Sequence, residues 1–122
     1  EFCQSLFKAY REEAQGAGRE LRTGQGMAMG ATLCIADTEE QAQELRDQFD
    51  WLFNAWFVPF GFPPGLVLQG TPESVTQQIR ELDGSLNFEE LFLWISTGLY
   101  EHSVMMRQIE LFATKVMPNF AD

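Results

Sequence analysis

The side chains best suited to chemistry in this sequence gather in one short stretch, FLWISTGLYEH, which runs from Phe92 to His102. An apolar run stops there at two hydroxyl residues, Ser96 and Thr97, and Gly98 follows them. The hydroxyl groups can donate hydrogen bonds to a bound molecule, and the glycine permits close approach of the backbone. His102 is the only histidine, and it lies about one helical turn further on, where it could transfer a proton.

The same stretch also has a purely structural interpretation. Gly98 can make a turn, Ser96 and Thr97 can end a strand, and His102 can open a helix. No cysteine, aspartate or second histidine stands near His102 to complete a triad or a metal site, so we expect no bound metal. His102 therefore stays a candidate for proton transfer, with a helix start as the alternative.

Two segments of the sequence predict the strands that would position these residues. MAMGATLCIAD ends at Asp37 and LFLWIS ends at Ser96, and both are apolar on their two alternating faces. That pattern is typical of buried parallel strands. Phe92, Trp94 and Ser96 then share one face of the second strand, because side chains alternate along a strand. We interpret Asp37 as a helix cap rather than as a catalytic base.

Apolar residues at steps of three and four predict four helices around the two strands. The second helix has an N-cap at Asp37 or Thr38, and the third has its N-cap at Thr71, with proline and glutamate directly after it. The four helices are expected to end at Gly16, Phe57, Asp83 and Pro118. The resulting order of strands and helices predicts an α/β fold with about two parallel strands and four helices.

Charge and composition restrict the possible partners. The chain has 122 residues, with 18 acidic and 8 basic side chains and a formal net charge of −10. We therefore expect no nucleic-acid partner and no membrane partner. No apolar run approaches the length of a membrane span, and no signal peptide is recognisable. Cys3 and Cys34 lack metal-ligand spacing and are expected to be reduced thiols of a cytoplasmic protein.

Three segments together resemble the luciferase-like flavin-dependent monooxygenases. They are IADTEEQAQ after a strand, GTPESVTQQIREL opening a helix, and FLWISTGLYEHSVMMRQIELFATKVMPNF as the end of the chain. The resemblance extends over roughly Tyr10 to Phe120. It implies the C-terminal part of a (β/α)₈ TIM barrel, so residues 1–122 would form one partial domain. A whole barrel needs about 250 residues, and we expect further chain to precede Glu1.

The resemblance also implies a function for the whole protein. It would be an oxidoreductase that uses flavin mononucleotide (FMN) or a deazaflavin, a small organic substrate and a flavin reductase as electron donor. Most contacts to the flavin phosphate would come from earlier strands that this chain lacks. We therefore expect the isolated chain to be inactive and to bind no flavin tightly.

The working face of such a barrel lies at the C-terminal ends of its strands. The resemblance thus implies that Ser96, Thr97 and Gly98 contact the flavin or the substrate, and that Trp94 could face the flavin. The alternative for Trp94 is a place in the core.

A loop rich in proline and glycine, VPFGFPPGLVLQG, follows the second helix. If the second and third helices both run away from the working face, this loop must climb back between them, and its length suffices. Phe60, Phe62 and Pro63 could then line the mouth of the site, close to where the similar enzymes carry a mobile lid. The alternative is a surface loop whose aromatic rings pack on the outside of the barrel.

Two parallel strands leave sheet edges and one apolar sheet face uncovered. We therefore expect the chain to be a homo-oligomer, completed by another subunit if not by further chain. A non-enzymatic binding or oligomerisation module derived from the same fold remains the alternative function. A small free-standing helical regulator would account for the acidity but not for the two buried strands.

Overall fold

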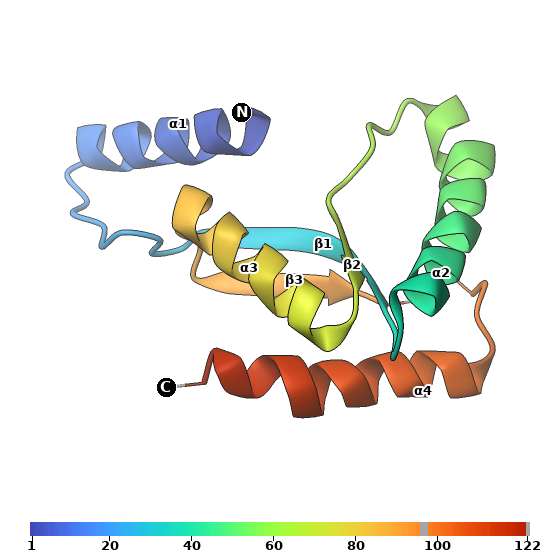
Figure 1. Ribbon diagram of the computed structural model, residues 1–122. Coiled ribbons are helices and arrows are strands. Elements are labelled where there is room, and N and C mark those ends of the chain that lie inside the picture. Colours follow the sequence, from blue (N-terminus) through green and yellow to red (C-terminus); the bar gives the residue numbers. More distant parts are fainter. Residues whose placement is uncertain (96–97, 122) are drawn as a thin grey trace.

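A computed structural model describes residues 1–95 and 98–121. Within this part the chain forms four α-helices and one parallel sheet of three strands (Figure 1). The elements are α1 (Phe2–Gly16), β1 (Ala28–Ile35), α2 (Glu39–Leu52), β2 (Val67–Gly70), α3 (Pro72–Leu86), β3 (Glu90–Trp94) and α4 (His102–Leu111). The α/β class and the parallel pairing of the two expected strands, β1 and β3, are confirmed.

The third strand corrects the expectation of two. β2 lies inside the segment interpreted as a loop, and it pairs with the C-terminal half of β1. It has only four residues and follows two prolines, so its sequence carries no strand periodicity of its own. Leu68 is its buried anchor, at 1% exposure. As expected, the chain runs back along the sheet between the second and third helices. β2 is the last part of this returning segment.

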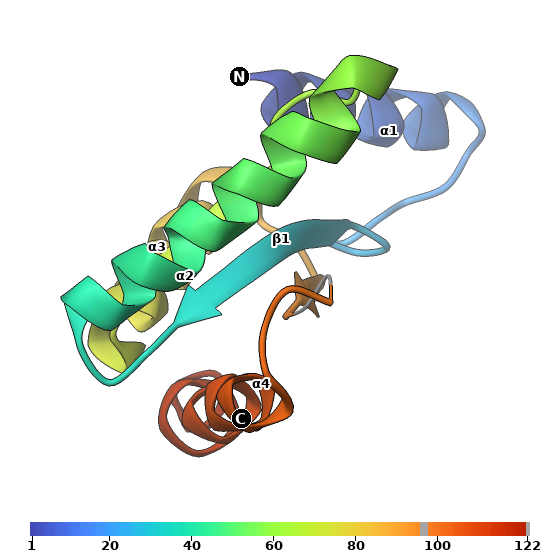
Figure 2. The ribbon, with the colours of Figure 1, turned by 90° about the vertical axis from the view of Figure 1, so that its right-hand side faces the viewer.

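The strand order is β2-β1-β3, so β1 is the central strand. The chain moves from β1 to one neighbour through α2 and then crosses to the other side of β1 through α3. Because both crossovers are right-handed by default, such a reversal places consecutive helices on opposite faces of the sheet. The packing agrees with this rule, because Leu33 and Ile35 of β1 lie in the cluster under α3 whereas Cys34 lies in the cluster under α2. Figure 2 shows that α4 also lies on the opposite side of β1 from α2.

The main core fills one face of the sheet, beneath α3 and the end of the last helix. Its fully buried members come from β1, β2, α3 and the last helical run, and they are Ala31, Leu33, Ile35, Leu68, Val75, Ile79, Leu111 and Val116. Val75 and Ile79, four positions apart, form the inner face of α3, as apolar residues at steps of three and four predict for a helix. A smaller cluster lies under α2 on the other face and contains Cys34, Ala36, Ala42 and Leu45.

Both long helical runs end in the same way. α2 continues as a π-helical turn (Phe53–Phe57) and a 3₁₀ turn (Val58–Phe60), and α4 continues likewise through Phe112–Val116 and Met117–Asn119. A proline stands at the second position of each 3₁₀ turn. Because proline has no N–H to donate, a regular α-helix cannot continue through that point.

The structure decides between the two N-cap candidates of the second helix and moves the end of the third. Thr38, not Asp37, is the N-cap of α2, and its hydroxyl oxygen accepts a hydrogen bond from the Gln41 N–H at 3.2 Å. α3 runs beyond Asp83 to Leu86 and ends at Asn87, which has a left-handed backbone with φ of 54°. No helix in the described residues is long and apolar enough to cross a membrane.

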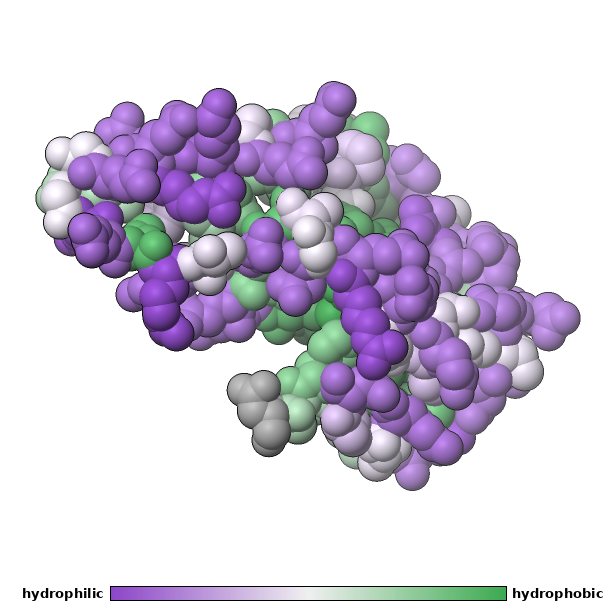
Figure 3. Space-filling view, turned by 60° about the vertical axis from the view of Figure 1, so that its left-hand side comes forward, coloured by the Kyte–Doolittle hydropathy of each residue, from purple (hydrophilic) through white to green (hydrophobic). Residues whose placement is uncertain are grey.

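The surface is mixed. Figure 3 shows hydrophobic surface in the middle of one side of the molecule, with hydrophilic surface around it. Large side chains that are exposed in the described structure include Phe2, Leu6, Trp51, Trp56, Phe60, Phe62, Phe92 and Trp94.

Candidate functional site

A cavity of about 720 Å³ opens at the carboxyl end of β3. Residues from the middle of β1, from the segment entering β2 and from β3 line it: Gly30, Ala31, Thr32, Gly65, Leu66, Phe92, Leu93, Trp94 and Ile95. None of these lining residues carries a charge. The cavity is thus suited to a flat apolar group and not to an ionic one.

The stagger of the three strands creates this cavity. Thr32 in the middle of β1 pairs with Trp94, the last residue of β3, and also with Val67, the first residue of β2. β2 therefore begins at the level where β3 ends. The segment that enters β2 reaches the cavity there, through Gly65 and Leu66.

Two aromatic side chains form one wall of the cavity. Phe92 is 60% exposed and Trp94 is 67% exposed, whereas Leu91 and Leu93 pack on the main core from the other face of β3. This corrects the expectation of a strand buried on both faces, because no described element covers the outward face of β3. Phe92 stands opposite Gly30 in the sheet, and no atom lies within 4 Å of the place where a Gly30 side chain would begin. The sheet surface at Gly30, beside the Phe92 and Trp94 rings, is therefore uncovered.

The predicted site residues fall into separate places. Trp94 lines the cavity. Ser96 and Thr97, which follow Ile95 in the sequence, lie outside the described residues. Gly98 has a left-handed backbone with φ of 81°, which favours glycine at this turn.

Three other candidates lie outside the cavity lining. His102 is the first residue of α4, and its side chain is exposed. Phe60 is the last residue of the long helical run that starts with α2, and Phe62 follows the turn at Gly61. The two side chains are 75% and 57% exposed. The Phe62 ring packs edge-on against Phe57, with ring centroids 5.9 Å apart. No group of three or more possible metal ligands occurs within the described part of the chain.

An ion pair that the sequence did not indicate joins β1 to the last helix. Arg107 donates from Nη2 to Asp37 Oδ1 at 2.6 Å and from Nε to Asp37 Oδ2 at 3.0 Å. A third contact runs from Arg107 Nη1 to Glu110 Oε2 at 2.7 Å. The hydrogen bonds from Arg107 hold the pKa of the Asp37 carboxyl below its ordinary value. Asp37 therefore pairs with Arg107 instead of capping α2.

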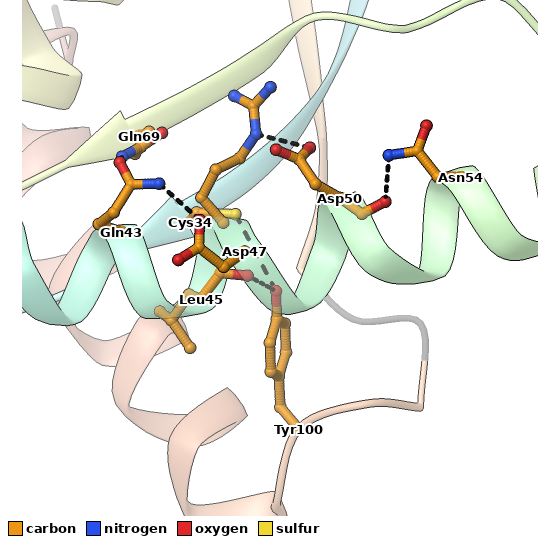
Figure 4. A network of polar contacts seen from close by, with 9 residues as sticks. Cys34, Gln43, Leu45, Asp47, Asp50, Asn54, Gln69 and Tyr100 are labelled. Carbon is orange, nitrogen blue, oxygen red and sulfur yellow. Dashed lines mark hydrogen bonds and ion pairs between the residues drawn. The ribbon is translucent and has the colours of Figure 1, made fainter.

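A second contact that the sequence did not indicate attaches the segment between β3 and α4 to α2 (Figure 4). Tyr100 donates its hydroxyl hydrogen to the Leu45 carbonyl oxygen of α2 at 2.8 Å, and its oxygen lies 4.0 Å from Cys34 Sγ. Burial raises the pKa of the Cys34 thiol to about 11 and also raises that of the Tyr100 hydroxyl. Both groups are thus neutral at pH 7, and Tyr100 serves as a neutral clamp on α2.

Glu39 joins the starts of two helices. Its Oε1 accepts hydrogen bonds from Ser74 Oγ at 2.5 Å and from the Thr71 N–H at 3.2 Å. These bonds, that from Ser74 first, lower the pKa of the Glu39 carboxyl. Gly70 lies against the same carboxylate, and its φ of 132° is a backbone conformation that other residues rarely adopt.

Solved structures share the fold of this chain. A monooxygenase, RslO1 from Streptomyces bottropensis, superposes with a TM-score of 0.79 at 20% sequence identity, over 98% of this chain and 38% of its own. The oxygenating constituent of 3,6-diketocamphane monooxygenase from Pseudomonas putida, a type II Baeyer–Villiger monooxygenase in complex with FMN, gives 0.77 at 20% identity, over 95% and 39%. Apo-MsnO8 gives 0.63 at 17% identity, over 93% and 41%.

This chain therefore spans about two fifths of the length of the structures that it matches. That share fits the expected fragment of a larger barrel. No protein-family model and no curated protein sequence matches the chain. At these identities the likeness shows the fold alone.

Proposed function

We propose that this chain is the C-terminal part of a luciferase-like, flavin-dependent monooxygenase of the cytoplasm. In that enzyme it would provide one wall of the site for the flavin and for a small organic substrate. One observation carries the proposal, namely the exposed aromatic wall of Phe92 and Trp94 over an uncharged cavity at the carboxyl end of β3. The shared fold supports it, since one of the similar structures is a monooxygenase in complex with FMN.

The described residues of this cavity fit the ring system of such a cofactor but not its phosphate group. Phe92, Trp94 and the uncovered sheet surface at Gly30 suit the apolar face of a flavin or deazaflavin ring. No arginine or lysine lines this cavity, so nothing described there would hold a phosphate group. The phosphate contacts would come from other parts of the enzyme. The isolated chain would accordingly bind flavin weakly and be inactive.

Each residue has a limited role in this proposal. Trp94 and Phe92 would orient the ring and exclude water from one side of it. Ser96 and Thr97 would donate hydrogen bonds to the flavin or the substrate, and Gly98 would let the backbone approach. When bound, a reduced flavin would supply the reactivity toward oxygen. A flavin reductase would supply the electrons that reduce the flavin. His102 is exposed at the start of α4, so we assign it no step.

A non-enzymatic binding or oligomerisation module is the second candidate. It is favoured by exposed aromatic side chains that do not line the cavity, among them Trp51, Trp56 and Phe60. Such residues suit a protein interface as well as they suit the surface of an enzyme.

Flavin binding separates the two candidates. We expect FMN to bind the isolated chain with a Kd of about 0.1 mM or weaker, and to bind the longest natural chain that contains this sequence at least about tenfold more tightly. In that longer chain, Trp94→Ala should weaken FMN binding by about tenfold, measured by quenching of flavin fluorescence. Trp51→Ala is the matched control, because Trp51 is exposed but does not line the cavity. Equal effects of the two substitutions, or no FMN binding by the longer chain, would favour the module.

A further inference from the structure

A second cavity, of about 640 Å³, lies outside the carboxyl end of β1, between α2 and α4. Its position follows from the strand order. The chain leaves β1 toward one neighbour and later returns to the other side, so helices on opposite faces diverge at this end of the sheet. Open α/β sheets bind ligands in the crevice where the strand order reverses in this way. The volume is within the range of about 300–1,000 Å³ that is usual for small-molecule sites.

The charged residues of this cavity leave a negative balance. Glu44 on α2 and Glu101 at the start of α4 line it from two sides. Neither carboxylate has an ion-pair partner within the part of the chain that the structure describes. Arg107 also lines the cavity, but Asp37 and Glu110 already neutralise its charge. The cavity therefore favours a cation and disfavours an anion.

A buried amide group gives independent evidence for a ligand. Gln108 of α4 lines the same cavity although it is only 1% exposed. Its Oε1 accepts a hydrogen bond from the Ile35 N–H at 3.3 Å, beyond the point where the pairing of β3 with β1 ends. Its Nε2 has no hydrogen-bond partner among the described residues. A buried donor without a partner destabilises the fold, and an acceptor oxygen on a ligand would remove that cost.

We propose that this cavity binds a small organic cation that carries a carbonyl or amide oxygen. Gln108 Nε2 donates a hydrogen bond to that oxygen after a small adjustment of the side chain. Glu44 and Glu101 attract the positive charge, and Leu45 and Val104 contact the apolar part of the molecule. This site shares no lining residue with the cavity beside Trp94, so it does not depend on the proposed flavin function.

Three probes that share one ring and differ in charge test the proposal. They are the 1-methylnicotinamide cation, neutral nicotinamide and the nicotinate anion, each titrated into the isotope-labelled chain and followed by NMR. We expect the cation to bind with a Kd of about 1 mM, nicotinamide several-fold more weakly, and nicotinate not at all. The shifts should centre on the Gln108 side-chain amide and on the backbone of Ala36, Leu45 and Val104.

Charge variants then identify the site. The double substitution Glu44→Gln and Glu101→Gln should weaken binding of the cation by about tenfold and leave nicotinamide unaffected. Asp47→Asn is the control, because Asp47 is exposed on α2 but does not line the cavity. Gln108→Met should weaken both the cation and nicotinamide, and if this variant does not fold, the charge variants decide alone. Equal affinity for all three probes, shifts centred on Trp94, or unchanged cation binding in the double variant would overturn the proposal.

Discussion

Arg107 of α4 binds Asp37 through two hydrogen bonds, at 2.6 Å and 3.0 Å, although 70 positions separate the two residues in the sequence. Asp37 follows the end of β1, and Arg107 is the sixth residue of α4. The pair therefore fixes α4 against the carboxyl end of the central strand. Both groups are about half exposed, so the geometry of the pair matters more than its burial.

This pair should make stability depend on pH in a defined window. The pKa of Asp37 is lowered in the folded chain, so its contribution is present above the ordinary carboxyl pKa of about 4 and is lost as the pH falls through the lowered value. We expect Asp37→Asn to reduce the stability at pH 7 and to flatten its fall in acid, measured by urea unfolding at several pH values. Asp83→Asn, which removes one exposed charge from α3, is the control. The same acid profile for wild type and Asp37→Asn would contradict this assignment.

Two glycines should respond in opposite directions to alanine. Gly70 has φ of 132°, and an added Cβ would lie 2.7 Å from Ser74 Cβ. We expect Gly70→Ala to lower the free energy of unfolding by about 1–3 kcal/mol. Gly84 lies inside α3 with no atom near the place of a Cβ, so Gly84→Ala should raise it by about 0.5–1 kcal/mol. Thermal and urea unfolding of both variants would test the contrast, which a loss of stability in Gly84→Ala would refute.

The two thiols should differ in reactivity. Cys34 is fully buried with its pKa raised to about 11, whereas Cys3 on α1 is partly exposed. Since the thiolate is the reactive form, we expect iodoacetamide at pH 8 to modify Cys3 alone in the folded chain and both residues in urea. Mass spectrometry counts the modified sites, and Cys3→Ser serves as the control. Modification of both thiols at similar rates in the folded chain would show that the region around Cys34 is open.

Tyr100→Phe tests the clamp on α2. It removes the hydrogen bond to the Leu45 carbonyl oxygen and keeps the ring. We expect a loss of about 1 kcal/mol in the free energy of unfolding. We also expect faster modification of Cys34, because weaker attachment to α2 exposes this buried thiol more often. Tyr10→Phe on α1 is the comparison. If Tyr100→Phe unfolds like wild type and leaves the rate of Cys34 modification unchanged, the Tyr100 hydrogen bond does not stabilise the fold.

We also propose that the isolated chain self-associates. Exposed aromatic residues on β3, on α2 and on the turns after α2 favour association, and the net charge of −10 opposes it. Added salt screens the charge, so the mean mass in light scattering should rise with salt concentration. A stable species near 13.9 kDa at both low and high salt would exclude self-association.

The local patterns of the sequence were sufficient for the elements that carry their own periodicity. β1 and β3 were recognisable because consecutive apolar residues fit a strand with a buried face, and the faces of α3 followed from Val75 and Ile79. β2 was not recognisable from the sequence, because its four residues form a strand only through their pairing with β1. The start of α3 at Thr71 was also predictable, since capping depends on neighbouring residues alone.

The position of Trp94 at the end of a strand could be predicted from the sequence, but its exposure could not. Whether a side chain is covered depends on elements distant in the sequence, and in the described structure no helix covers that face of β3. Gln108 shows the opposite case, because a polar residue is fully buried where the end of β3 leaves the Ile35 N–H in need of an acceptor. Its apolar neighbour Ile109 is 45% exposed instead. The amino-acid sequence thus determined the strands, the helices and their order, whereas only the tertiary structure decided which side chains line the cavities, because the stagger of the strands and the reversal of their order create those cavities.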